Sequence, residues 1–284
     1  MFHMISLPCF GLSVLGLGVA ACGTLIGAGG GFMLMPLLLL LYPHHNPGEL
    51  AAVSLGCILL NTVSGAVAYG RMEQVDYKSA LLFSTVTVPA AVLGALATAC
   101  LPRQGFEAIF ALFILCLALL LVLNPKVLAR GRRKAKSEDL GPAGPGLVRI
   151  AKSVNGIIFE YDYHRLTAMA VFFVLGFLVS FLGIGGGSLI LPALIYLMDF
   201  PVFIAGGTTQ LIVAVVCLAG TITHLGIGSI HAWGFNRIAA IGIGMLIGGQ
   251  LGAFLSRKIR GAWILRSLAA ALAAAGISMV FAVL

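Results

Sequence analysis

Apolar residues along this chain fall into long runs that are separated by short polar connections. Eight runs are about as long as a helix that crosses a bilayer, which needs roughly 17 to 25 mostly apolar residues. Two further apolar runs, at Phe32–Tyr42 and Ser188–Met198, are too short to cross at full thickness. The pattern predicts eight crossings plus two Gly-broken or re-entrant half-helices and leaves nine or ten crossings open. The eight predicted spans are Ile5–Ile26, Leu50–Tyr69, Ser79–Leu101, Phe106–Leu123, Thr167–Ile184, Val202–Ile227, Trp233–Leu255 and Ala262–Leu284.

The overall composition supports a membrane location. Of the 284 residues, 60% are hydrophobic and only 9% are charged, which is more apolar surface than a soluble domain could bury. We therefore expect an all-α, polytopic protein whose main partner is the lipid bilayer. The net charge of +8 does not indicate nucleic-acid binding, because the basic residues lie between apolar runs. The 6 cysteines lack C-x-x-C spacing, so neither a disulfide framework nor a metal site is predicted, and no motif calls for a cofactor.

One connection, residues 124–165, is long and strongly basic. It holds nine of the 17 Lys and Arg residues, so the positive-inside rule predicts that it lies in the cytoplasm. Apolar residues recur at helical spacing between Leu147 and Ile158, beside Arg149 and Lys152. This part is interpreted either as a short helix on the inner headgroups or as a linker without regular structure.

A cytoplasmic linker fixes the rest of the predicted topology. Four crossings on each side of it place both termini inside and leave residues 43–49 and 199–201 outside. Three basic residues disagree, because Arg257, Lys258 and Arg260 would then face outward. Because the linker is more strongly charged, we take the predicted orientation from the linker. We expect the protein in the cytoplasmic (inner) membrane.

The two parts of the chain on either side of the linker are related in sequence. "LIGAGGGFMLMP" at 25–36 matches "FLGIGGGSLILP" at 181–192, and the order of further matches persists for roughly 100 residues. We predict a first transmembrane repeat at 1–123 and a second at 166–284, each with about four transmembrane helices. The further matches are "AAVSL" (51–55) with "AGGTT" (205–209), Gly65 with Gly220, and "LGA" (93–95) with "LGA" (251–253).

Each repeat contains a glycine pentad, "GAGGG" at 27–31 and "GIGGG" at 183–187. Glycine costs about 1 kcal/mol in a helix interior, so two matched pentads predict helix breaks. Unwound backbone at membrane depth must line protein or a water-filled cavity, and the half-helices that follow would present positive N-termini to an anion. The alternative is that the pentads only allow close helix packing. We expect that role for Gly11, Gly16, Gly18, Gly65, Gly94, Gly244, Gly248 and Gly252.

Polar side chains inside the predicted spans are neutral apart from one histidine. No Asp, Glu, Lys or Arg lies deep in a span, which argues against a carboxylate relay or a cage for a hard cation. Ser54 and the segment 208–210 are equivalent in the repeat, so we expect them to face one another across a shared cavity. The predicted substrate-binding residues are Gly27, Gly29, Gly30, Gly31, Ser54, Gly183, Gly185, Gly186, Gly187, Ser188, Thr208, Thr209 and Gln210.

Four more residues are assigned either a substrate or coupling role or a simpler structural one. Asn61 and Gln250 would contact the substrate or form interhelical hydrogen bonds. His224, which aligns with Tyr69 in the repeat, is the only ionisable side chain well inside a predicted span. It would couple a proton to transport or lie at the membrane interface.

These motifs resemble the TauE/SafE sulfite exporter family, also called the toluene-sulfonate uptake permease family. The resemblance rests on "GAGGG…P" and "GIGGG…P", on "AAVS" and "AGGT" after them, and on the later "LGA" pair, and it covers nearly the whole chain apart from the linker. It implies two related halves that move sulfite, sulfonates such as taurine or sulfoacetate, or related carboxylates. It points to the pentad glycines with Ser54, Thr208 and Thr209. Leu55 and Gly56 depart from the pattern, so we expect more polar contacts from the second half.

The sequence therefore predicts a secondary transporter and not an enzyme, with export of a small sulfur-containing or organic anion as the leading function. At an inside-negative potential, expelling an anion is worth about 2.3 kcal/mol per charge per 100 mV, so export needs no coupled ion. The alternatives are an uptake permease for a carboxylate or metal ion and a membrane-embedded transferase. The substrate, the direction, the proton stoichiometry and the choice between monomer and homodimer are left open.

Overall fold

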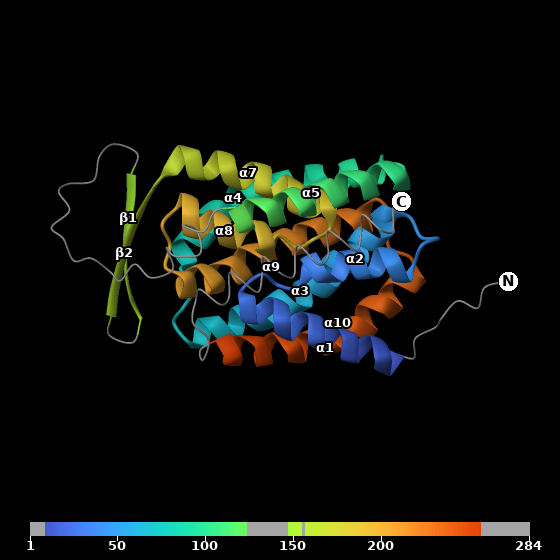
Figure 1. The fold of residues 1–284 in the computed structure, drawn as a ribbon, viewed down its shortest axis with the longest axis horizontal. Coiled ribbons are helices and arrows are strands. Elements are labelled where there is room, and N and C mark those ends of the chain that lie inside the picture. Colours follow the sequence, from blue (N-terminus) through green and yellow to red (C-terminus); the bar gives the residue numbers. More distant parts are fainter. Residues whose placement is uncertain (1–8, 124–146, 155–156, 257–284) are drawn as a thin grey trace.

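The computed structural model describes residues 9–123, 147–154 and 157–256. These residues form a bundle of long helices with a β-hairpin across one end (Figure 1). The predicted span Ala262–Leu284 and the first residues of Ile5–Ile26 lie outside the described residues. The described elements are α1 (Cys9–Ile26), α2 (Gly31–Leu41), α3 (Pro47–Arg71), α4 (Tyr77–Ala99), α5 (Arg103–Leu123), β1 (Leu147–Val154), β2 (Ile157–His164), α7 (Arg165–Leu182), α8 (Gly187–Leu197), α9 (Val202–Gly226) and α10 (Ala232–Ser256).

Apart from the hairpin, the described fold is all-α and suited to a bilayer. Five of the described helices, α3, α4, α7, α9 and α10, are long and apolar enough to cross a membrane. Along α10, Ile243, Ile247 and Leu251 are each more than half exposed and recur every four residues. Such an apolar outer stripe is what lipid contact requires, since it would be costly in water.

Small residues bring α1 and α10 into close contact. A side chain at Gly244 would meet the carbonyl of Ser13, and side chains at Gly248 and Gly252 would lie 2.5 Å from carbonyls one and two turns further along α1. The packing role predicted for these three glycines is confirmed. The same prediction is wrong for Gly18, where a Cβ would meet nothing within 4 Å. The contacts advance in the same order along both helices, so α1 and α10 run parallel.

One end of the bundle carries the hairpin, and we call it the hairpin end. The hydroxyl groups of Tyr163 in β2 and Ser79 at the start of α4 lie 3.0 Å apart. The Tyr163 ring also packs near Phe200, which follows α8, with ring centroids 6.1 Å apart. Burial raises the pKa of the Tyr163 phenol, so this group stays a neutral hydrogen-bonding partner. The hairpin, the start of α4 and the end of α8 therefore share this end.

The opposite end is named the Trp233 end after the residue at the start of α10. The Trp233 ring stacks on His45 at 3.9 Å between centroids and meets Tyr42 edge-on at 4.9 Å. Both partners lie between α2 and α3. At the start of α5, the guanidinium of Arg103 donates to the carbonyl oxygens of Tyr42 at 3.3 Å and His45 at 2.6 Å. The end of α2 and the starts of α5 and α10 are therefore joined there.

The two broken helix pairs enter the bundle from opposite ends. The chain enters in α1 at the Trp233 end and returns there in α2, whereas α7 enters at the hairpin end and α8 returns to that end (Figure 1). Each pair is re-entrant and makes no net crossing, so the predicted count of eight crossings is wrong. The expectation that 43–49 and 199–201 lie on the same side is also wrong, because these loops are at opposite ends.

Helix α10 ends at the hairpin end of the bundle. It runs from the Trp233 end to the hairpin end, so the chain leaves it on the side of the basic connection (Figure 1). Arg257, Lys258 and Arg260, the residues that disagreed with the predicted topology, lie outside the described residues.

The end of the linker is a hairpin rather than a helix or an irregular segment. Strands β1 and β2 pair antiparallel from Leu147 with His164 to Val154 with Ile157. Both sequence interpretations of this part are therefore wrong. β-branched and aromatic residues are frequent in both strands, which favours extended structure. Asn-Gly, the strongest short signal for a hairpin, separates the strands in the sequence.

Candidate functional site

Both predicted helix breaks are present, with the same backbone conformation in each. Three glycines in each pentad adopt positive φ, between 65° and 81°, where a side chain would be strained. This explains why the chain uses glycine and not merely small residues at these positions. The positive-φ glycines are Gly27, Gly29 and Gly30 in the first break and Gly183, Gly185 and Gly186 in the second.

The half-helices α2 and α8 begin directly at these breaks. The Gly30 carbonyl accepts bonds from the N–H groups three and four residues later, and the Gly186 carbonyl does the same at the start of α8. The N–H groups of Gly31, Phe32 and Ser188 have no backbone acceptor among the described residues. Each start therefore offers free donors and the positive end of a helix dipole.

The two breaks meet in the interior of the bundle. A side chain at Gly31 would collide with the carbonyl oxygen of Ile184, and one at Gly187 would collide with the carbonyl oxygen of Ala28. This reciprocal pair of contacts is what an approximate two-fold axis between the breaks generates. The positive ends of α2 and α8 consequently converge on one region.

Polar side chains without partners lie beside this region. Gln210 of α9 is fully buried, and a Cβ placed on Gly29 or Gly65 would lie 3.9 Å or 3.1 Å from its amide oxygen. Neither amide atom of Gln210 has a hydrogen-bond partner among the described residues, and the same holds for the hydroxyls of Thr209 and Ser188. Leaving such a group unpaired costs about 1–3 kcal/mol, so the set is suited to a polar ligand.

Ser54 and Thr208 do not face one another as expected. The Ser54 hydroxyl donates to the carbonyl of Gly183 at 2.7 Å, and the Thr208 hydroxyl accepts a bond from the Asp76 backbone N–H at 3.0 Å. Helices α3 and α9 run antiparallel, and the residue after Ser54 contacts Gly220. Ser54 is therefore at about the level of Gly220 along α9. Thr208 is about 12 residues from that level, or roughly 18 Å along the helix.

The residues with two proposed roles form interhelical bonds. Asn61 donates to the Gly29 carbonyl at 2.8 Å and accepts a bond from the Thr24 hydroxyl at 3.0 Å. Tyr69 donates to the Thr24 carbonyl at 3.0 Å, and Gln250 donates to a backbone carbonyl of α3 at 2.8 Å. The structural alternative is therefore present for Asn61 and Gln250. Thr24 is a neutral polar residue of a predicted span that was assigned no role, although it lies three residues before the first pentad.

His224 lies near the end of α9 on the Trp233 side. Its side chain is fully buried, and neither ring nitrogen has a partner among the described residues. Over the same part of the chain, no group of three or more His, Cys, Asp or Glu side chains is placed to hold a metal ion. The donors near the breaks are therefore amides, hydroxyls and backbone N–H groups.

Comparison with known proteins assigns the chain. The family model described as Sulfite exporter TauE/SafE matches residues 12–279. The chain belongs to the TauE/SafE family. It is 32% identical over 257 residues to "Probable membrane transporter protein YunE" of Bacillus subtilis (strain 168), covering 88% of this chain and 89% of that protein. It is 26% identical over 235 residues to "Probable membrane transporter protein" of Xylella fastidiosa (strain Temecula1 / ATCC 700964), covering 83% and 80%. No solved structure matches the chain.

The family resemblance inferred from the two pentads is thus confirmed, and the match extends over both of them. TauE/SafE proteins are transporters and not enzymes, so this chain is a multi-pass membrane transporter.

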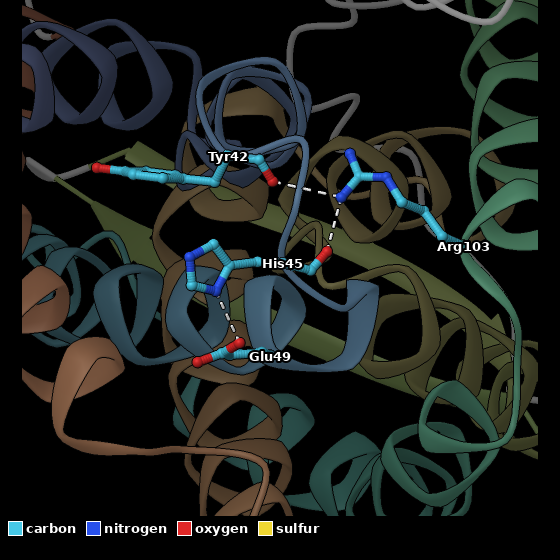
Figure 2. Close-up of polar contacts among 4 residues, drawn as sticks. All are labelled: Tyr42, His45, Glu49 and Arg103. Carbon is cyan, nitrogen blue, oxygen red and sulfur yellow. Dashed lines mark hydrogen bonds and ion pairs between the residues drawn. The ribbon is translucent and has the colours of Figure 1, made fainter. Parts of the chain in front are cut away.

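One polar cluster of this TauE/SafE chain was not predicted. Figure 2 shows Arg103 donating to the carbonyls of Tyr42 and His45, while His45 Nδ1 lies 2.9 Å from a carboxylate oxygen of Glu49. The sequence could have indicated this cluster, because Arg103 lies at a helix N-terminus. A cation there opposes the helix dipole and needs hydrogen-bond acceptors elsewhere. The cluster fastens the end of α2 to α5 and so fixes where this half-helix points.

Proposed function

We propose that this TauE/SafE transporter exports a small sulfur-containing or organic anion, such as sulfite, a sulfonate or sulfoacetate. The observation that carries the proposal is the meeting of the α2 and α8 N-termini beside Gln210, whose amide has no partner among the described residues. Two positive dipole ends and neutral donors favour an anion held without a fixed countercharge.

The charges around the breaks support an anion over a cation. The sequences of α2, α8 and α9 contain no Asp or Glu. A site for a hard cation at this depth would need carboxylates, while an oxyanion needs donors. Gln210 and Ser188 provide such donors near the free backbone N–H groups, and Thr209 precedes Gln210 on α9.

The opposed course of the two re-entrant pairs supports an alternating-access mechanism. We propose that the chain consists of two related halves of opposite orientation, with the substrate at their interface and with rocking of one part against the other. The reciprocal contacts of Gly31 with Ile184 and Gly187 with Ala28 lie on this interface. Small residues there allow two backbones to approach without intervening side chains.

The distribution of basic residues supports a cytoplasmic hairpin end in the inner membrane. Five of the seven described Lys and Arg residues belong to that end. With this orientation the membrane potential favours movement of an anion from the hairpin end toward the Trp233 end. The five residues are Arg71, Lys78, Arg149, Lys152 and Arg165, and the other two are Arg103 and Arg237.

The experiment is a flux and binding screen on purified, reconstituted protein with sulfite, sulfoacetate, taurine, thiosulfate and small carboxylates. We expect at least one sulfur-containing anion to be moved and to raise the thermal midpoint. Gly186→Leu should abolish both effects, because it places a side chain at positive φ within the second break. Ile247→Ala on the exposed stripe of α10 is the control. If the wild-type protein neither moves nor binds any of these anions, the proposal fails.

A further inference from the structure

The repeat produces two similar clusters in which a glycine of a long helix contacts a hydroxyl residue of a broken one. A Cβ on Gly65 of α3 would lie 3.3 Å from the side chain of Thr24, and a Cβ on Gly220 of α9 would lie 2.8 Å from the Ser180 hydroxyl. The sequence alignment of the halves makes the same correspondence. The equivalent pairs are Thr24 with Ser180, Asn61 with Val216, Gly65 with Gly220 and Tyr69 with His224.

In the first cluster the polar groups satisfy one another. Thr24 donates to Asn61, Asn61 donates to the Gly29 carbonyl, and Tyr69 donates to the Thr24 carbonyl, at 2.8–3.0 Å. A buried network of this kind is complete and holds the first break in place.

In the second cluster the corresponding polar groups have no hydrogen-bond partner among the described residues. The Ser180 hydroxyl and both ring nitrogens of His224 are buried without a partner among the described residues. Val216 stands where the first half has the bridging amide of Asn61, so the link is missing. His224 also has a shorter reach than Tyr69. Buried polar groups are normally paired, so this cluster calls for a polar occupant.

His224 and the glycine that contacts Ser180 of α7 lie on one face of α9. His224 is four residues beyond Gly220, and helical side chains lean toward the N-terminus, so its ring leans toward the position that contacts Ser180. Along α9, Gly220 is about 15 Å from Gln210 in the direction of the Trp233 end. The cluster therefore adjoins the start of the second break, where the Ser180 carbonyl accepts a bond from the Gly183 N–H, and it is separated from Gln210 in the direction of that end.

We propose that Ser180 and His224 form a second subsite for the transported oxyanion, beside the second break and on the Trp233 side of Gln210. This rests on the proposed function. The Ser180 hydroxyl donates one hydrogen bond, and a neutral imidazole always carries one N–H donor. Neither α7 nor α9 contains an Asp or Glu that would repel the anion. An anion leaving Gln210 would bind here before it reaches the outer face. The free-energy cost of desolvating the anion is therefore divided between two binding positions.

The sharpest test is to restore the missing amide with Val216→Asn. In the first half an amide at the equivalent position completes the network, so here it should bond Ser180 or His224 and occupy the subsite. We expect the ligand-free thermal midpoint to rise by about 2–4 °C and the flux of sulfite, or of whichever screened anion the wild type moves fastest, to fall roughly tenfold.

Removal of the donors completes the test. Ser180→Ala and His224→Leu should each lower flux and apparent affinity roughly tenfold, whereas His224→Gln, which keeps a donor, should retain most of both. Ser13→Ala is the matched control, because this hydroxyl bonds the Ala240 carbonyl between α1 and α10. We expect it to change the midpoint but not the affinity.

Two results would overturn the inference in distinguishable ways. If Val216→Asn raises the midpoint while this variant, Ser180→Ala and His224→Leu all keep wild-type flux and affinity, water alone satisfies the cluster and only the second subsite is lost. If the wild-type protein moves none of the screened anions, the proposed function fails and the second subsite fails with it.

Discussion

Helices α3 and α9 are equivalent in the repeat and equal in length, at 25 residues each, yet their polar side chains behave differently. On α3, Asn61 and Ser54 donate to carbonyls in the first and second breaks respectively. On α9, Gln210, Thr209 and His224 are buried with no partners among the described residues. The two helices thus agree in length and differ in how their polar side chains are paired. We infer that α3 holds both breaks in shape and that α9 carries the groups that bind.

The largest effect should come from disturbing the geometry that both helices share. Gly187→Ala introduces a methyl group that collides with the carbonyl of Ala28, and backbone cannot rotate away as a side chain can. We expect a loss of at least about 3 kcal/mol of stability and no measurable transport. Thermal unfolding in detergent and flux in vesicles would measure this. Gly18→Ala is the control, since nothing lies near a Cβ there; equal behaviour of the two variants would refute the contact between the breaks.

The next effect tests α3 as the supporting helix. Asn61→Leu removes an amide that serves both the Gly29 carbonyl and the Thr24 hydroxyl, and it leaves both unpaired in the interior. We expect about 2–4 kcal/mol of lost stability, which for a chain of this size lowers the thermal midpoint by roughly 5–10 °C. Residual folded protein should bind the anion with nearly normal affinity. A large loss of affinity at an unchanged midpoint would place Asn61 in the binding site.

The opposite outcome is expected on α9. Gln210→Leu removes two polar atoms that have no partner among the described residues, so stability should be unchanged or slightly higher. Affinity for the transported anion should fall by roughly 10- to 100-fold, because a hydrogen bond to a charged ligand is lost. Ligand titration followed by thermal shift would measure both quantities on one sample. A drop in midpoint without a change in affinity would reverse the roles assigned to α3 and α9.

The two breaks could be predicted from the sequence, because glycine triplets at matching positions have few structural explanations. It did not reveal that the broken pairs enter from opposite ends, since an apolar run has the same length in either direction. Ser54 and Thr208 were expected to meet because they are equivalent in the repeat. Equivalence under a two-fold axis brings residues together only near that axis, and these two lie far from it.

The hairpin was misread for a different reason. Between Leu147 and Ile158 the apolar residues fit helical spacing, but the β-branched content and the Asn-Gly pair favour strands. The absence of hydrogen-bond partners for Gln210 and His224 among the described residues could not be predicted either. Hydrogen bonding depends on which neighbour lies within reach in three dimensions. Ser180 was overlooked although its alignment with Thr24 was available.

The smallest effect distinguishes support from binding at Ser54, which the sequence assigned to the substrate. Ser54→Ala removes one hydrogen bond to the Gly183 carbonyl, so we expect a loss of about 1 kcal/mol and a fall in midpoint of roughly 2–4 °C. Its distance from Gln210 along the bundle predicts unchanged affinity. Ser54→Thr, which keeps the hydroxyl, should recover part of the midpoint. If Ser54→Ala instead weakens anion binding tenfold and leaves the midpoint alone, α3 contributes to recognition, and the division of labour between α3 and α9 no longer holds.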